Sequence, residues 1–521
     1  MSESEFVAQA LRQRVQGDVM VDEKTLSRHS TDMSIYEVRP LAVVVPQDER
    51  DVVAAVRFAR EEGITITPRG GGSSTAGSAL GRGLMLAFPR KGPMSSILEF
   101  AASDGQPSVT VEPALLHDDL QAFLREQGFY LPSDPSSGAI SVLGGNVATK
   151  ASGPHALRHG SIDRYLCHLR FVTAQGELVD TASEDTIPDR IRAGVLDLGH
   201  DLLSDAATVR RLDERKDMKL ASGYNLFAFL RHDRVGEIVA QLLVGSVGTL
   251  GVITQATLKA EPYVPGHAAM LIYFRSLHEA GDAVQHIRDL DVAAIEIMNH
   301  RTIAIVRERY PDVEVPGGEV HMLLVEFEGP ERFEQMARVE ELLQTKGYDL
   351  GGAPHTARDE AEQQRLWKVR KSLFPTLRNY RSHLKALSLV NDVGVNAIHL
   401  ADLILDLQAI FDRHELLAAI YGHAGSGNLH LRPLFDVSDP NLPELLLQIA
   451  DEVYEAVFRY DGTITAEHSM GRLRVPYLAR EWGEKIVGYM RRVKDIFDPD
   501  DMLNPDVMFG NRSLIDDMKI G

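Results

Sequence analysis

Cysteine is almost absent from this sequence, since Cys167 is the only one among 521 residues. A single cysteine excludes an internal disulfide, a cysteine-ligated iron–sulfur cluster and a structural zinc finger formed by this chain alone. No run of about 18 apolar residues occurs, so we expect no membrane-spanning helix. The first residues, MSESEFVAQALRQRVQ, lack the apolar core of a secretory signal. We therefore expect a cytoplasmic protein, either free or peripheral on the inner face of a membrane.

Net positive charge is missing too, because 55 Lys and Arg stand against 75 Asp and Glu, which gives a formal net charge of −20. Such an acidic chain is a poor partner for nucleic acid, whose phosphates require a basic surface. Hydrophobic residues at 44% and charged residues at 25% are typical of a globular protein rather than a disordered one. At this length we expect more than one domain.

The first clear pattern is a strand–helix–strand unit over residues 41–67. A β-branched run at 41–45 predicts a buried strand, helical spacing at 48–62 ends at Gly63, and 64–67 predicts a second strand. This unit delivers a glycine loop at the end of a parallel strand. Further strands are expected at 84–87, 108–111, 168–173, 177–180 and 251–259, with helices at 115–127 and from 236 onward.

The glycine-rich character stops near residues 262–266, and we place a domain boundary there, between 1–265 and 266–521. Beyond it, strands at 269–274 and 321–328 alternate with helices at 279–290 and 331–346. This alternation predicts an α+β domain of antiparallel sheet and helices. Further helices are expected at 360–381, at 400–414 and within 482–505.

Three stretches rich in glycine and serine lie in the first half, at residues 68–75, 133–153 and 245–254. Glycine lets the backbone approach a ligand closely, and successive N–H groups form an anion-binding nest. One such loop is usually only a turn, whereas three in one domain favour a large dinucleotide. The loops match neither the Walker pattern nor the Rossmann fingerprint.

The sharpest motif is a pair of histidines, His423 and His430, on either side of Ala-Gly-Ser-Gly-Asn. These turn residues predict that the chain reverses and brings the two histidines together. Glu467 and His468 follow in a second polar motif. Two histidines and a carboxylate suit zinc or another divalent metal. The alternative is structural, with Glu467 paired to an arginine and His468 packed in the core.

The three loops resemble the FAD-binding domain of vanillyl-alcohol-oxidase-type flavoenzymes, in the branch of D-lactate, glycolate and D-2-hydroxyglutarate dehydrogenases. The resemblance implies an α+β flavoprotein with a PCMH-type FAD-binding domain over 1–265 and a substrate-binding cap domain over 266–521, whose C-terminal segment packs back near the flavin. It implies non-covalent FAD, because the first loop has no histidine. The FAD contacts that it implies are Pro68, Arg69, Gly70, Gly71, Gly72, Ser73, Ser74, Thr75, Pro135, Gly144, Gly145, Asn146, Ala148, Ser152, Gly153, Gly248, Gly251, Ile253 and Asn504.

The histidine motif is similar to the C-terminal domain of the same branch, which holds a divalent metal beside the flavin. The resemblance implies that His423, His430 and Glu467 bind the metal, which we take as zinc, and that His468 is the catalytic base. It also implies that Arg370 grips the carboxylate of the substrate.

The chain departs from this branch at four positions. Val390 stands where the D-2-hydroxyglutarate dehydrogenases carry a lysine, and Arg432 stands where they carry an asparagine. We therefore expect Arg432 to supply the missing positive charge. Ser426 and Ser469 replace an acidic residue and a glycine, and both changes leave the ligand set intact.

These features predict an FAD-dependent dehydrogenase that oxidises a D-2-hydroxy acid, such as D-lactate or D-2-hydroxyglutarate, by hydride transfer to flavin N5. The electron acceptor stays open among an iron–sulfur protein, an electron-transfer flavoprotein, a cytochrome and a quinone. One alternative is a non-redox flavoenzyme of the alkyl-dihydroxyacetone-phosphate synthase type. Another is a flavin-binding subunit of a larger electron-transfer complex. The sequence His-Leu-Arg-Pro at 430–433 resembles that of larger bacterial members of this branch, which are fused to an iron–sulfur domain. Because this chain lacks the cysteines that such a cluster needs, we expect any cluster to lie on another polypeptide.

Overall fold

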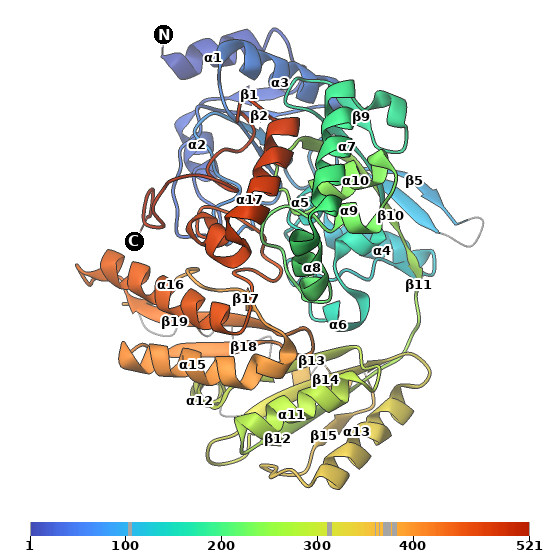
Figure 1. The fold of residues 1–521 in the computed structure, drawn as a ribbon, viewed down its shortest axis with the longest axis vertical. Helices are drawn as coiled ribbons and strands as arrows, with labels where there is room; N and C mark the ends of the chain where they lie inside the picture. Colours follow the sequence, from blue (N-terminus) through green and yellow to red (C-terminus); the bar gives the residue numbers. More distant parts are fainter. Residues whose placement is uncertain are drawn as a thin grey trace.

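The structure is a computed structural model that describes residues 2–102, 107–309, 315–359, 361–363, 365–367, 377 and 383–519. The first half of the chain gathers at one end of the molecule together with the long C-terminal helix α17 (Leu478–Phe497), and the segments drawn in yellow and orange form the other end (Figure 1). Among the described residues, no helix combines the length and the apolar character needed to cross a bilayer.

A four-stranded sheet near the N-terminus has the order β1–β2–β4–β3. Its strands are β1 (Asp18–Met20), β2 (Ala42–Val45), β3 (Ile66–Arg69) and β4 (Leu84–Ala87). Helix α3 (Glu49–Glu62) begins at Asp48, whose carboxylate accepts two backbone N–H bonds, and ends at the left-handed Gly63. The predicted strand–helix–strand unit is confirmed, but β4 lies between β2 and β3 and pairs parallel with both. All four residues of β4 are buried, which suits the middle of a parallel sheet.

The second sheet is antiparallel and has the order β5–β6–β10–β8–β9. Its strands are β5 (Ile97–Ala101), β6 (Ser108–Val111), β8 (Leu166–Val172), β9 (Leu178–Asp180) and β10 (Val252–Lys259). Helix α10 (Val235–Leu243) packs on β8, and α7 (Asp189–Ser204) packs against α17. The strands that we predicted here are confirmed. Strand β5 was missed because it is a half-exposed edge without clean alternation.

The second half of the chain is built on an eight-stranded sheet in the order β15–β12–β14–β13–β18–β19–β16, with β17 beside β19. Its strands are β12 (His267–Phe274), β13 (Ala294–Met298), β14 (His321–Glu328), β15 (His355–Ala357), β16 (Leu384–Ala386), β17 (Val393–Gly394), β18 (Ala418–His423) and β19 (Asn428–Asp436). All the pairings are antiparallel, as predicted.

Helices cover both faces of this sheet. They are α11 (Leu277–Arg288), α12 (His300–Arg309), α13 (Arg332–Lys346), α15 (Leu400–Arg413) and α16 (Leu442–Arg459). Along β12, Met270 and Ile272 join the core with α11 and α15, whereas Leu271 and Tyr273 join the core with α12. Because both faces are buried, the strand reads as a continuous apolar run. The helix predicted at 360–381 lies mostly outside the described residues.

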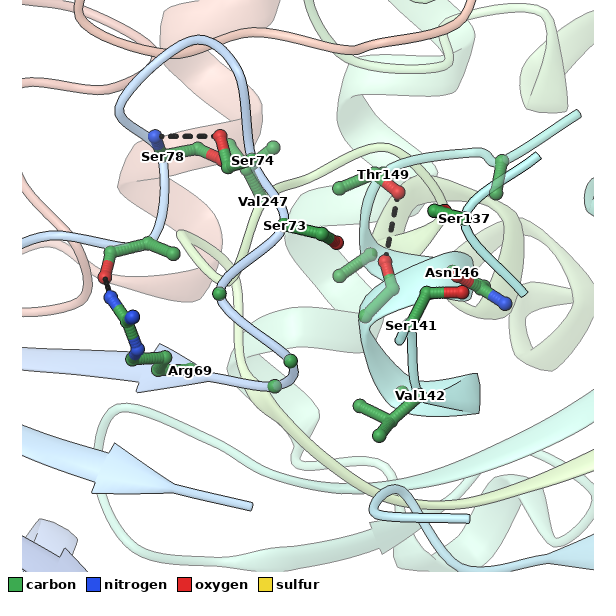
Figure 2. Close-up of a pocket in the computed structure, with 18 of the residues that line it drawn as sticks. Arg69, Ser73, Ser74, Ser78, Ser137, Ser141, Val142, Asn146, Thr149 and Val247 are labelled. Carbon is green, nitrogen blue, oxygen red and sulfur yellow. Dashed lines mark hydrogen bonds between the residues drawn. The ribbon is translucent and has the colours of Figure 1, made fainter. Parts of the chain in front are cut away.

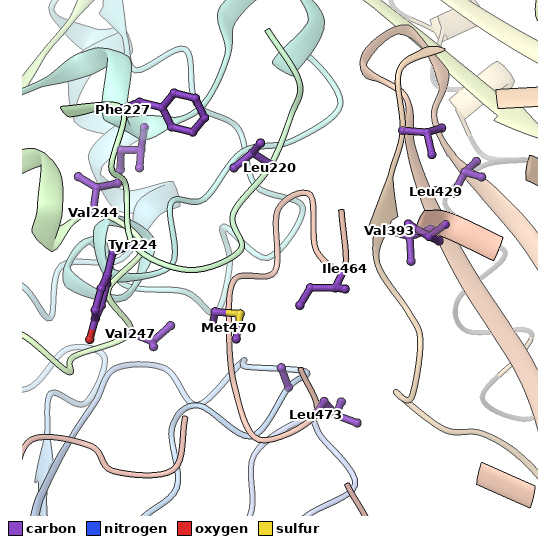
Figure 3. Close-up of a cluster of buried hydrophobic side chains, with 14 of the residues drawn as sticks. Leu220, Tyr224, Phe227, Val244, Val247, Val393, Leu429, Ile464, Met470 and Leu473 are labelled. Atoms are coloured by element: carbon purple, nitrogen blue, oxygen red, sulfur yellow. The ribbon is translucent and has the colours of Figure 1, made fainter. Parts of the chain in front are cut away.

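One hydrophobic core joins the two halves. Figure 3 shows buried side chains of residues 220–247 lying beside those of residues 393–473. Leu220 and Val247 come from the first half, and Leu429, Ile464 and Met470 from the second. The glycine-rich stretches of the first half and the histidine motif of the second half are therefore joined by packed side chains.

Candidate functional site

A cavity of about 440 Å³ lies at this junction, and the three glycine-rich stretches line it. Figure 2 shows Ser73 and Ser74 of the first stretch opposite Ser137, Asn146 and Thr149 of the second. Every residue predicted to contact FAD lines the cavity, except Gly153 and Asn504. Arg432, Glu467 and His468 line it as well, and so it extends to the histidine motif.

Close backbone contact shapes the cavity wall. A Cβ atom on Gly71 would lie 2.2 Å from the carbonyl oxygen of Ile140, so any other residue would push the first two stretches apart. The guanidinium of Arg69 donates to the carbonyl oxygens of Thr31 at 2.8 Å and of Ala79 at 3.0 Å. Arg69 therefore braces the first loop from behind (Figure 2). Small side chains, hydroxyl groups and backbone fit a large, flat, anionic dinucleotide such as FAD.

Asn504 supports the cavity from outside its lining. Its Nδ2 donates to the carbonyl oxygens of Ser78 at 2.8 Å and of Val247 at 2.7 Å, and its Oδ1 accepts from the hydroxyl of Thr67 at 3.1 Å. The C-terminal segment thereby ties β3 to Ser78, just beyond the first stretch, and to the third stretch. Gly153 likewise packs against the backbone of Asp134 behind the wall.

The β18–β19 hairpin brings the two histidines together. Tyr421 lies opposite His430, and His423 lies opposite Asn428, so both histidines project from the same face. Their Nε2 atoms are 3.3 Å apart. Gly427 closes the turn with φ 68°, and a Cβ there would lie 1.9 Å from the carbonyl oxygen of Val395. The turn chemistry that we read from the sequence is therefore present.

Glu467 completes a compact group of donor atoms. Its Oε1 lies 3.3 Å from Nε2 of His423 and 3.3 Å from Nε2 of His430. Three donors about 3.3 Å apart match the edges of a tetrahedron around zinc, whose bonds to nitrogen and oxygen are about 2.0–2.1 Å. Glu296 bonds Nδ1 of His423, which turns Nε2 of that ring toward Glu467. The donor set fits a divalent metal.

Buried charges set the protonation of this group. Burial raises the pKa of Glu467, but the charges of Lys219 and His423 hold it well below its usual range. Burial lowers the pKa of His423, yet the Glu296 and Glu467 carboxylates raise it overall. Burial lowers the pKa of His430, and it lowers that of His468 to about 4. The His468 imidazole is therefore neutral at neutral pH, and burial makes it a weaker base than an exposed histidine.

Asp392 is a site residue to which the sequence analysis gave no role. One of its buried carboxylate oxygens, Oδ2, accepts the backbone N–H groups of Ala466 at 2.9 Å, Glu467 at 3.0 Å and His468 at 2.9 Å. Its other oxygen accepts from the amide of Asn428 at 2.8 Å. Asp392 thus fixes the Glu-His segment to the hairpin. Its only signal in the sequence is a carboxylate two positions after the apolar pair Leu389 and Val390.

Of the two arginines proposed for substrate binding, Arg432 is the one that lies within the described residues. Arg432 on β19 is 7% exposed, lines the cavity and donates to the hydroxyl of Ser388 at 3.2 Å. Arg370 lies outside the described residues. Val390 is fully buried, and as a valine it has no charge to offer a substrate.

Comparison with known proteins identifies the class of this fold and site. A profile of FAD-binding domains matches residues 40–182, and a profile of FAD-linked oxidase C-terminal domains matches residues 266–508. The two profiles span most of the chain, which belongs to the FAD-linked oxidase family.

Individual relatives fall in the expected branch. The chain is 30% identical over 506 residues to D-2-hydroxyglutarate dehydrogenase of Pantoea ananatis. The matched region covers 91% of this chain and 48% of that protein. This chain therefore spans about half the length of that relative. It is 27% identical to glycolate oxidase subunit GlcD of Bacillus subtilis, over 91% of this chain and 90% of the relative.

A solved structure supports the fold independently. An alkyldihydroxyacetonephosphate synthase superposes with a TM-score of 0.67 at 18% identity, over 97% of this chain and 86% of its own. At this identity the likeness establishes the fold, a PCMH-type FAD-binding domain joined to an α+β domain, and leaves the reaction open.

Proposed function

We propose that this chain is an FAD-dependent dehydrogenase that oxidises a D-2-hydroxy acid to the 2-oxo acid. One observation carries the proposal: the cavity bounded by the three glycine-rich stretches continues without a break to His468, Glu467 and Arg432. A flavin held by the stretches would thus share one chamber with a base, a metal ligand and a cation. The names of the relatives, a D-2-hydroxyglutarate dehydrogenase and a glycolate oxidase subunit, support this reaction class.

When bound, FAD supplies the acceptor for the hydride that leaves C2 of the substrate, and a divalent metal, zinc by its donor set, supplies a Lewis acid for the hydroxyl group. The metal would be held by His423, His430 and Glu467. His468 takes the hydroxyl proton on its neutral imidazole. Arg432 binds the carboxylate of the substrate and so orients C2 toward the flavin-binding wall. Arg370 is proposed for the same carboxylate.

The organisation of the whole protein is part of the proposal. We assign residues 1–265 to the FAD-binding domain and 266–521 to the cap domain, with the segment around Asn504 returning to the first. The FAD is held without a covalent bond. The electron acceptor would be a separate molecule, an iron–sulfur protein, an electron-transfer flavoprotein, a cytochrome or a quinone. The protein works in the cytoplasm or against the inner face of a membrane.

The test is the visible spectrum of the flavin-loaded protein under anaerobic conditions. D-lactate, glycolate, D-malate and D-2-hydroxyglutarate are added one at a time, and we expect one of them to bleach the flavin band. Bleaching would also exclude the non-redox synthase reaction as the main activity. His468→Ala should retain FAD and reduce it about 10²–10⁴-fold more slowly, because it lacks the base. If no acid bleaches the metal-loaded protein, the proposed substrate class is wrong.

A further inference from the structure

The two carboxylate oxygens of Glu467 face different partners. Oε1 points to the histidine pair, 3.3 Å from each Nε2. Oε2 accepts a hydrogen bond from Nζ of Lys219 at 2.5 Å and another from the hydroxyl of Ser152 at 3.2 Å. The histidines belong to the second half of the chain, whereas Lys219 and Ser152 belong to the first. This single carboxylate is therefore shared between the two halves.

Lys219 is held firmly in this place. Its side chain is 9% exposed, and its ammonium also donates to Oδ1 of Asn428 at 3.0 Å. The backbone beside it is anchored, since the N–H of Ala221 donates to the carbonyl oxygen of Thr465 at 2.9 Å. A buried ammonium that leaves such partners loses its compensation for desolvation. The contact with Glu467 is thus a fixed part of the site, unlike a surface ion pair.

We propose that Lys219 is a positioning residue that, together with Ser152, restricts Glu467 to one coordinating oxygen. This inference rests on the proposed function, because it takes His423, His430 and Glu467 as ligands of a divalent metal. A carboxylate can bind such an ion through one oxygen or through both. The second oxygen would occupy a position that a catalytic metal keeps open for its substrate. By occupying Oε2, Lys219 and Ser152 keep that position free for the hydroxy acid.

Lys219→Met tests this role with a neutral side chain of similar length. Lys216→Met is the matched control, because it removes the same charge three residues away, where the side chain is 50% exposed and bonded to Asp213 at 2.9 Å. Wild type and both variants are purified with FAD and loaded with Co²⁺. The readouts are cobalt and FAD content, the ligand-field absorption of cobalt, and KM and kcat with the acid that bleaches the flavin.

We expect Lys219→Met to retain cobalt and FAD, because the loss of a nearby positive charge does not weaken the binding of a cation. Its cobalt absorption should weaken, since a second carboxylate oxygen raises the coordination number. Its kcat/KM should fall on the order of 10–100-fold. Added cobalt should raise its Tm more than that of wild type, because the metal alone then neutralises Glu467. Lys216→Met should match wild type in every readout.

Ser152→Ala provides a second test that keeps the buried charge pair and decides the matter if Lys219→Met does not fold. It should shift the cobalt absorption in the same direction by a smaller amount. Wild-type absorption and KM in the variants that fold would overturn the positioning role and leave the proposed function standing. If wild type itself takes up no cobalt, the metal centre of the proposed function fails, and this inference fails with it.

Discussion

The carboxylate of Asp392 holds His468 by its backbone, with Oδ2 2.9 Å from the His468 nitrogen. The same oxygen accepts two further backbone N–H groups and the hydroxyl of Thr465 at 2.6 Å. A single buried carboxylate thus fixes both the proposed base and the Glu467 beside it. Hydrogen bonds to a charged acceptor of this kind are each worth about 1.5–3 kcal/mol.

Asp392→Asn should therefore lower the free energy of unfolding by about 1–3 kcal/mol, because a neutral oxygen accepts these bonds more weakly. It should also slow flavin reduction, since His468 and Glu467 lose their fixed positions. Urea unfolding and anaerobic stopped-flow reduction measure the two effects. Asp402→Asn, a side chain that is 51% exposed on α15, serves as the control. Equal stability of Asp392→Asn and wild type would contradict the account.

A buried ion pair anchors the segments that carry Lys219 and Glu467. Arg215, with a side chain 1% exposed, donates to Oε1 of Glu481 at 2.8 Å. Glu481 also accepts from the hydroxyl of Ser222 at 2.6 Å and from the N–H of Ile464 at 2.9 Å. Arg215→Met should cost roughly 3–5 kcal/mol, because it leaves a buried charge unpaired.

The exposed pair of Arg480 and Asp451 gives the comparison for Arg215→Met. Arg480→Ala should change the free energy of unfolding by less than about 1 kcal/mol, since solvent screens that pair. Chemical denaturation measures both variants. An Arg215→Met loss as small as that of Arg480→Ala would show that the buried pair does not hold these segments.

Ser469 occupies a backbone conformation suited to glycine. It is fully buried with φ 60°, and its hydroxyl donates to the carbonyl oxygen of Gly245 at 3.2 Å. Ser469→Gly relieves about 1 kcal/mol of strain and loses one hydrogen bond of similar size, so its Tm should stay near that of wild type. Ser469→Val should lower Tm by several degrees, because a β-branched residue fits this region worst. Thermal melts that rank Val above Gly would refute this.

A histidine and carboxylate cluster spans the two halves and should give a pH-dependent stability. Burial lowers the pKa of His155, but Asp134 and Glu326 raise it well above 6.5 overall. Burial raises the pKa of Glu328, but a hydrogen bond from His159 and the charge of His155 lower it to about 2. His155 contributes fully to the free energy of unfolding below pH 6.5, and this contribution is lost as the pH rises through its folded-state pKa. Glu328 contributes fully above pH 4.5, and its contribution is lost as the pH falls toward 2.

The cluster should therefore stabilise the protein most between pH 4.5 and 6.5. We expect the difference in unfolding free energy between wild type and His155→Gln to be largest in that window and to shrink toward alkaline pH. Urea titrations across that range measure it. His278→Gln, at a side chain that is 66% exposed, is the control and should show a flat difference. A wild-type advantage that grows with rising pH would contradict the assignment.

Much of this protein could be predicted from local patterns. The alternation and capping around α3, the strands β4, β6 and β14, and the turn between His423 and His430 depend on neighbours in the sequence. The glycine-rich stretches likewise predict a dinucleotide-binding pocket, because their small residues are close together in the sequence. Local chemistry of this kind is visible without the fold.

Other features depend on contacts between distant residues, and only the tertiary structure decided them. Nothing near Lys219 in the sequence indicates that its ammonium meets Glu467, 248 positions away. The place of β4 between β2 and β3, and the bonds from Asp392 to residues 466–468, follow from which surfaces bury together. The local motifs of the sequence by themselves determined the protein family and the residue types at the candidate site. The folded chain decided which groups orient that site, because long-range packing brings together residues that no local pattern connects.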